Sequence, residues 1–211
     1  MFENIRVLAQ NCIRIQTGDK VIYTDPFQMD GSPRDGDLIL ITHDHFDHFS
    51  PEDIEKAAGP DAVMVVPENM KKKAKGAAKL VKEILTVEPG GAYEICGVRF
   101  ETIPSYNVSK NFHPKSAGWV AYILDLDIGR IFVAGDTDIN EDNKKVVCDV
   151  ALVPVGGTYT MTASEAAELV NLIQPKLAIP VHYGGIVGSK KDGEAFAKLV
   201  KKPVEVDVRM G

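Results

Sequence analysis

The sequence predicts an α/β protein in which two mixed β-sheets stack face to face between helices, a four-layer αββα sandwich. Apolar segments of strand length fall into two blocks, and helical segments interleave with both blocks. The length of 211 residues suits one large domain spanning 1–211, which can bury a core without disulfides or structural metals. The hydrophobic periodicity alone does not distinguish this fold from a three-layer α/β fold, so the choice between them depends on the sequence motifs.

The first block is rich in short strands. Thr17-Gly18-Asp19-Lys20 predicts a hairpin turn, and the all-apolar run at 38–41 predicts a strand buried on both faces. Ser50-Pro51-Glu52-Asp53 is typical of a helix start, and Gly59 is expected to end that helix. A second helix is expected over 71–84. The expected strands are 5–9, 12–16, 21–24, 38–41 and 62–66.

The second block repeats the mixture of strands and helices. Thr162-Ala163-Ser164-Glu165 is a capping box that opens a helix to about Ile173. A further helix is expected over 192–201, and Asp127-Ile128-Gly129 is expected to form a hairpin turn. The expected strands are 92–96, 98–103, 119–126, 130–134, 150–155, 177–181 and 204–208.

Composition and charge narrow the cellular setting. The formal net charge of −6 disfavours long nucleic acids and anionic membranes as partners. Cys12, Cys96 and Cys148 are odd in number and far apart, which argues against a disulfide framework or a cysteine zinc site. No apolar run reaches the ~18 residues of a membrane span. A cytoplasmic protein with a small-molecule substrate is therefore expected, and a homo-oligomer remains open.

One hexapeptide concentrates metal-binding chemistry. His43-Asp44-His45-Phe46-Asp47-His48 places three imidazoles and two carboxylates within six residues, after a buried strand, where sites are commonly built on open sheets. Imidazole nitrogens and carboxylate oxygens are ligands of zinc, iron and manganese. His43 and His45 can converge on one ion, and Asp47 and His48 are positioned for a second.

Two later strands end in ligand-type residues. Asp136 follows the apolar strand of 130–134 through Gly135, and His182 follows the strand of 177–181. Alone, a strand-terminal Asp is often a turn former, and a lone His carries little weight. Together with the hexapeptide they indicate a metal site assembled from distant parts of the chain.

These motifs, in this order, resemble the metallo-β-lactamase superfamily. The resemblance spans 5–185 and implies the αββα fold. It also implies that His43 and His45 bind metal one with a third histidine, that Asp47, His48 and His182 bind metal two, and that Asp136 bridges the two ions. Thr24-Asp25-Pro26 and the segment 154–161 are compatible with a branch that includes relatives of the ascorbate-6-phosphate lactonases.

The third histidine departs from the family pattern. The family commonly places it two residues beyond a proline that follows a strand, and Tyr106 stands there, two residues after Pro104. The nearest histidine is His113. Either His113 folds back to metal one, or that metal has a weaker ligand set. We favour His113 because the other four of the five histidines all fall on the motif.

The resemblance implies a hydrolase that cleaves a small ester, lactone or phosphodiester with metal-activated water. Two divalent ions are expected, zinc first, with manganese or iron as alternatives. Asp47 is expected to orient the water as the catalytic residue. Tyr106, Asn107 and Tyr183 are expected to bind substrate. The cationic metal site, together with these residues and with Lys110 and Lys115, suggests an anionic substrate.

Three alternatives remain open at this stage. A nuclease or phosphodiesterase of the same fold keeps the chemistry and changes the substrate. A non-catalytic metal-binding module keeps the ligands alone. Di-iron oxidoreductases of the superfamily usually carry Glu where His45 stands, so a redox function is disfavoured.

Overall fold

The first half of the chain forms a six-stranded mixed sheet in the computed structural model, which describes residues 2–210. Met1 and Gly211, the ends of the expected domain, lie outside the described residues. The strands lie in chain order: β1 (Ile5–Ala9), β2 (Cys12–Thr17), β3 (Lys20–Thr24), β4 (Gly36–Leu40), β5 (Ala58–Pro67) and β6 (Glu83–Val87). β1 to β3 pair antiparallel, and β3 to β6 pair parallel.

The second half forms a seven-stranded mixed sheet. Its strands are β7 (Ala92–Ile95), β8 (Val98–Pro104), β9 (Val120–Leu126), β10 (Gly129–Val133), β11 (Val150–Pro154), β12 (Leu177–Val181) and β13 (Glu205–Val206). β7 to β10 pair antiparallel, and β10 to β13 pair parallel. β8, β10 and β12 therefore run in the same direction, and their carboxyl ends reach one edge of the sheet.

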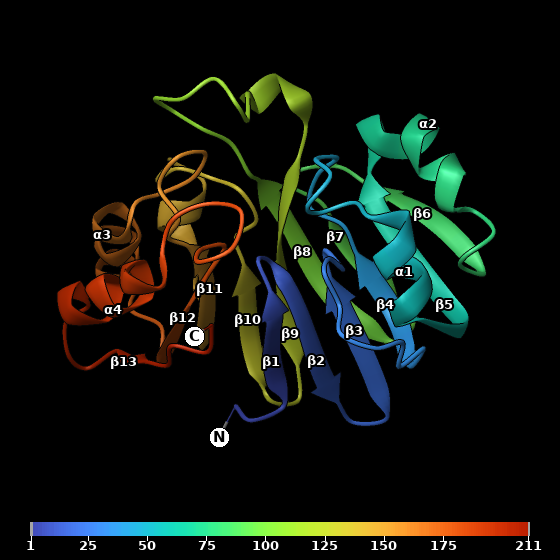
Figure 1. Ribbon diagram of the computed structural model, residues 1–211, viewed down its shortest axis with the longest axis horizontal. Helices are drawn as coiled ribbons and strands as arrows, with labels where there is room; N and C mark the ends of the chain where they lie inside the picture. Colours follow the sequence, from blue (N-terminus) through green and yellow to red (C-terminus); the bar gives the residue numbers. More distant parts are fainter. Residues whose placement is uncertain (1, 211) are drawn as a thin grey trace.

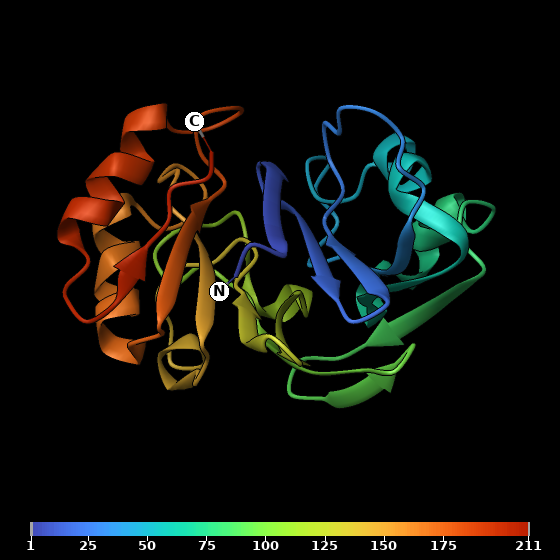
Figure 2. The ribbon, with the colours of Figure 1, turned by 90° about the horizontal axis from the view of Figure 1, so that it is seen from below.

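The two sheets pack face to face, with helices on both outer sides (Figures 1 and 2). Side chains alternate along each strand, so Leu38 and Leu40 enter the core between the sheets while Ile39 and Ile41 pack beneath the outer helices. This explains why the run at 38–41 is apolar throughout, and it confirms the predicted four-layer αββα sandwich.

Each sheet has its own pair of helices. α1 (Pro51–Ala57) and α2 (Lys71–Ala74) cover the first sheet, and α3 (Ala163–Ile173) and α4 (Lys190–Leu199) cover the second. Ser50 caps α1 by accepting a hydrogen bond from the Asp53 amide, and Thr162 and Glu165 form the predicted capping box of α3. Short 3-10 turns lie at Glu68–Met70, Lys75–Ala77, Lys115–Ala117 and Asn143–Lys145.

The predicted helix over 71–84 is wrong. Only the single turn of α2 and a 3-10 turn form there, and 83–87 instead becomes β6, paired in parallel with β5 from Val63 to Pro67. Lysine and alanine favour a helix locally, but pairing with β5 determines the structure of the second part of the segment.

Within the described residues, no helix combines the length and apolarity needed to cross a membrane.

The sequence suggested that Gly59 ends α1, but the helix already ends at Ala57. The helix passes directly into β5 at Ala58, and Gly59 belongs to that strand. A Cβ at Gly59 would lie 2.9 Å from the carbonyl oxygen of Gly36 on the neighbouring strand. The glycine is needed because two backbones approach closely there.

Candidate metal centre

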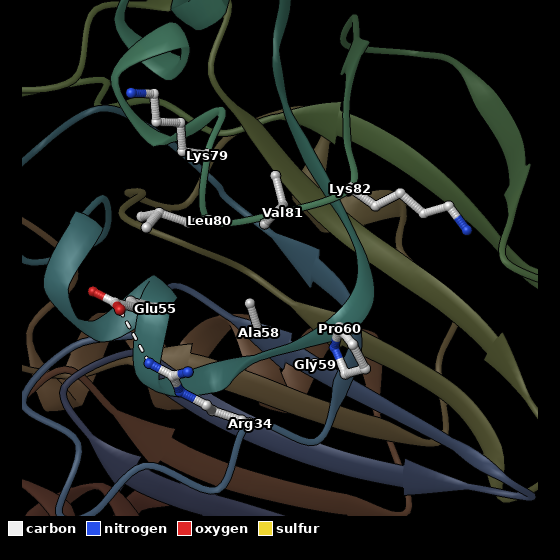
Figure 3. A pocket seen from close by; sticks show the side chains of 9 residues that line it. All are labelled: Arg34, Glu55, Ala58, Gly59, Pro60, Lys79, Leu80, Val81 and Lys82. Carbon is white, nitrogen blue, oxygen red and sulfur yellow. Dashed lines mark hydrogen bonds and ion pairs between the residues drawn. The ribbon is translucent and has the colours of Figure 1, made fainter.

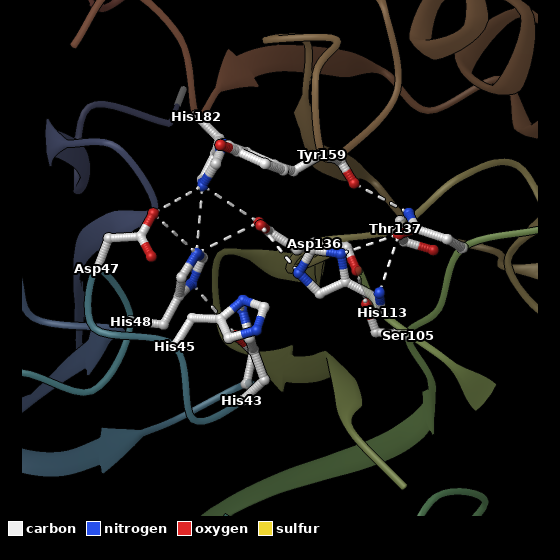
Figure 4. Close-up of polar contacts among 12 residues, drawn as sticks. His43, His45, Asp47, His48, Ser105, His113, Asp136, Thr137, Tyr159 and His182 are labelled. Atoms are coloured by element: carbon white, nitrogen blue, oxygen red, sulfur yellow. Dashed lines mark hydrogen bonds and ion pairs between the residues drawn. The ribbon is translucent and has the colours of Figure 1, made fainter. Parts of the chain in front are cut away.

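The first sheet supplies its ligand-type side chains on one loop, between β4 and α1. His43 and His48 are buried, His45 is half-buried, and Asp47 is 7% exposed. The second sheet supplies Asp136 after β10, His182 after β12 and His113 from the long loop after β8. Figure 4 shows these side chains pointing toward one another from both sheets. The structure thus brings together all seven residues that the sequence proposed as ligands.

His43, His45 and His113 form the first group of possible ligands. The facing nitrogens His43 Nε2 and His45 Nδ1 are 3.1 Å apart. The ring of His113 lies 5.1 Å from that of His43 and 4.9 Å from that of His45. Trp119, which no sequence motif pointed to, packs against all three rings at 5.0 to 5.4 Å. His113 therefore folds back to the motif, as we favoured.

Asp47, His48 and His182 form the second group. His182 Nε2 lies 3.2 Å from both His48 Nε2 and Asp47 Oδ2.

Asp136 lies between the two groups. Its Oδ2 is 3.3 Å from His113 Nε2, and its Oδ1 is 3.3 Å from His48 Nε2 and 3.4 Å from His182 Nε2. One carboxylate therefore faces ligand atoms of both groups, the arrangement expected of a bridging residue.

These residues fit a pair of divalent cations. Two nitrogens bound to one tetrahedral zinc at 2.0–2.1 Å lie about 3.4 Å apart, close to the separations in both groups. His113 Nε2 and Asp136 Oδ1 are buried and have no hydrogen-bond partner among the described residues. Buried polar atoms without partners are costly, and one cation in each group would satisfy these two atoms.

The protonation of the first group also suits metal binding. Burial lowers the pKa of His43 well below its ordinary value and lowers that of His45 as well. Thr42 Oγ1 donates to Asp25 and so accepts a hydrogen bond from His43 Nδ1 at 3.0 Å. This tautomer leaves the lone pair of His43 Nε2 free for a cation.

The second group is held by carboxylates. Burial alone would lower the pKa of His48, but Asp136 and Asp25 outweigh it and hold that pKa well above its ordinary value. Burial alone would raise the pKa of Asp136, but the charges of His182 and His48 hold it well below its ordinary value. A cation binding here must therefore displace a proton from His48.

Asp25 anchors the loop of the first sheet. This fully buried carboxylate accepts hydrogen bonds from His48 Nδ1 at 2.7 Å, from the amide and hydroxyl of Thr42 at 2.8 and 2.6 Å, and from Asn11 Nδ2 at 2.6 Å. It fixes the ring of His48 so that Nε2 faces the other ligands. In the sequence, Asp25 is visible only as part of Thr24-Asp25-Pro26, and that motif does not indicate this anchoring role.

Asn107 and Asp138 hold His113 in place on the second sheet. Asn107 Oδ1 accepts hydrogen bonds from the amide and from Nδ1 of His113, both at 3.0 Å. Asp138 accepts from Asn107 Nδ2, from the amides of Val108 and Ser109, and from Lys110. Asp138 lies two residues after Asp136, so one short segment carries both a possible ligand and the anchor of another.

The pocket over the centre is lined by a different set from the expected substrate-binding residues. Its lining is His45, Phe46, Asp47, Phe112, Asp136, Tyr159 and Ile186. Tyr106 lies outside this lining and its hydroxyl donates to Asp142, while Asn107 contacts His113. Tyr183 also lies outside it, fully buried, with its hydroxyl donating to the carbonyl oxygen of Met210.

Another hollow lies on the far side of the first sheet, between α1, the start of β5 and the segment 79–82 (Figure 3). Arg34, Lys79 and Lys82 give it a cationic lining, and Arg34 pairs with Glu55 at 3.0 Å. No histidine lines it among the described residues, so it offers no second cluster of the same kind.

The two stacked sheets and the histidine–aspartate centre define a protein of the metallo-β-lactamase fold. A family model described as a beta-lactamase superfamily domain matches residues 4–182. The chain belongs to that superfamily and, within it, to the UPF0173 metal-dependent hydrolase family, as the following relatives show.

The UPF0173 metal-dependent hydrolase of Methanopyrus kandleri is 31% identical over 197 residues, covering 86% of this chain and 84% of the relative. That of Pyrococcus horikoshii is 33% identical over 205 residues, covering 90% and 88%. A crystal structure of a Parabacteroides distasonis protein, described as a metal-dependent hydrolase, matches with a TM-score of 0.84 at 28% identity, covering 97% of this chain and 91% of that one. The finer resemblance to ascorbate-6-phosphate lactonases stays a prediction.

Proposed function

We propose that this chain hydrolyses a small ester, lactone or phosphodiester with water activated at the two ligand groups. The observation that carries the proposal is that the ligand-type residues open onto a pocket: His45, Asp47 and Asp136 belong both to the groups and to the pocket lining. A purely structural metal site is closed by its ligands, whereas a catalytic one keeps a position accessible.

His43, His45 and His113 would hold one cation, and Asp47, His48 and His182 the other, with Asp136 shared. When bound, two divalent ions supply a Lewis acid and bring the pKa of water from 15.7 to about 7. Asp47 would orient the attacking water, because its carboxylate lines the pocket while Oδ2 faces His182. The expected metal is zinc, with manganese and iron as alternatives.

Removing and restoring the metal tests this proposal. The protein is stripped with a chelator, reloaded with zinc, manganese or iron, and assayed on p-nitrophenyl acetate, a simple lactone and bis(p-nitrophenyl) phosphate. We expect turnover of at least one substrate to vanish on stripping and to return with one metal. A metal-loaded protein with two bound ions and no turnover of any of the three would favour the non-catalytic module.

A further inference from the structure

Apolar side chains surround the opening of the metal centre. Phe46, Phe112, Tyr159 and Ile186 are 67%, 48%, 37% and 40% exposed, and all four line the same pocket as His45, Asp47 and Asp136. Ten large hydrophobic residues are exposed among those that the structure describes, and these are four of them. Single exposed apolar residues are common, but a cluster in one hollow marks a binding surface.

This apolar rim (Phe46, Phe112, Tyr159 and Ile186) is built from four separate loops. The Phe112 ring packs edge-on against Tyr159 at 4.7 Å, and the Phe46 ring packs edge-on against Phe27 at 6.0 Å. The loop of Tyr159 is tied down because its carbonyl oxygen accepts a hydrogen bond from Asn107 at 3.0 Å. The rim is therefore held in place by contacts of its own, next to the ligand residues.

Apart from the divalent cations that the ligand groups would hold, the pocket offers no positively charged side chain to an anionic substrate. Among the described residues that line it, none is Lys or Arg. The nearby candidates are engaged elsewhere: Lys110 pairs with Asp138 at 2.5 Å, and Lys115 pairs with Asp142 at 3.0 Å. Phosphate and carboxylate groups are usually bound by Arg, Lys or backbone amides. These ion pairs remove Lys110 and Lys115 from the reasons that the sequence gave for an anionic substrate, and the cations of the site remain as a reason.

We infer that the substrate is an uncharged carbonyl compound, an ester or lactone, whose apolar group binds against Phe46, Phe112, Tyr159 and Ile186. This rests on the proposed function and narrows it by favouring a substrate whose non-reacting part is apolar over one in which that part is charged. The pocket volume of about 380 Å³ lies within the range of small-molecule sites and can take a short acyl chain. The carbonyl would face His45, Asp47 and Asp136, and the chain would extend outward over the apolar rim.

Hydrolysis of p-nitrophenyl esters of increasing acyl length tests the apolar rim. Each buried methylene contributes up to about a fourfold gain in binding, so kcat/KM should rise at least ~10-fold from acetyl to hexanoyl. Ile186→Ala should reduce this ratio by about threefold. The control Leu172→Ala removes an exposed apolar side chain on α3, outside the pocket, and should leave the ratio unchanged.

Binding separates this inference from the proposed function. Calorimetry on the zinc-loaded protein compares acetohydroxamate, hexanohydroxamate and phenyl phosphate, with and without Ile186→Ala. We expect hexanohydroxamate to bind at least ~10-fold more tightly than acetohydroxamate in the unmodified protein. That preference without any ester turnover would remove the hydrolase proposal and leave the apolar site standing. Equal binding of the two hydroxamates, or tightest binding of phenyl phosphate, would overturn the inference.

Discussion

The two sheets supply the metal centre in different ways. The first sheet provides four side chains within six residues of one loop, His43 to His48, anchored by the buried Asp25. The second provides His113, Asp136 and His182 from three connections, and His113 lies on a loop that also carries the exposed Val108 and Phe112. One half of the centre is therefore fixed locally, whereas the other half exists only once the second sheet is assembled.

The difference separates ligand placement from pocket shape. The loop of the first sheet is held by hydrogen bonds of 2.6 to 2.8 Å to one buried carboxylate. The loop after β8 has buried anchors at its base and exposed apolar side chains at its tip. We expect changes near Asp25 to alter metal affinity strongly, and changes in the loop after β8 to alter both metal one and substrate preference.

The largest expected effect comes from removing one ligand from each half. His45→Ala should reduce turnover by ~1,000-fold or more and lower metal content, because metal one loses a nitrogen that lines the pocket.

His113→Ala should lower the number of metal ions bound per protein chain by about one. Elemental analysis measures the metal, and circular dichroism checks that both variants remain folded. Full activity in His45→Ala, or two ions at undiminished affinity in His113→Ala, would contradict the assigned ligand sets.

The sequence predicted most of the fold because its signals are local. The strands before the hexapeptide, the hairpin turn at 17–20 and the capping box at Thr162 depend on neighbouring residues, and the structure has them. β6 escaped prediction because lysine and alanine before it favour a helix, while pairing with β5 determines the outcome. Local propensity could not reveal a partner strand about twenty residues away.

The residues of the metal centre also differ in how well the sequence predicts them. The hexapeptide 43–48 can be recognised directly in the sequence. The placement of His113, in contrast, depends on a loop that folds back so that His113 contacts Asn107. The sequence suggested Tyr183 as a substrate-binding residue, but His182 has a positive φ of 57° and the Tyr183 hydroxyl donates to the carbonyl oxygen of Met210 in the carboxyl-terminal segment. The apolar rim has no sequence signature, since its members come from four loops.

Asp25→Asn tests the anchor of the first half. The carboxylate accepts four hydrogen bonds, and an amide would place N–H groups against donors. We expect metal affinity to fall by ~10–100-fold, as on losing a partner that orients a ligand. The matched control is Asp35→Asn. It removes a carboxylate that accepts hydrogen bonds from Arg14 and Tyr23 of the first sheet, and it should leave metal affinity unchanged. Equal affinity in Asp25→Asn and wild type would show that His48 needs no anchor.

Asp138→Asn tests the anchor of the second half and should have the smallest effect. Asp138 does not contact His113 and acts on it indirectly, through Asn107 and the loop amides of Val108 and Ser109, so we expect affinity for one ion to fall by less than ~10-fold and the other ion to be unaffected. Burial opposes ionisation of Asp138, but Lys110 and two backbone amides lower its pKa. Because the pKa of Asp138 is lowered, the stabilisation that its carboxylate provides is complete above the pKa of an unfolded Asp, about 3.9, and is lost only as pH falls below that value. The loss of zinc affinity in Asp138→Asn should therefore be the same from pH 5 to 8. Titrations of zinc across that range measure it, with Asp142→Asn as the control because it breaks the Lys115 pair on the same loop without touching Asn107. A loss as large as that in Asp25→Asn would mean that both halves of the centre are equally dependent on their anchors.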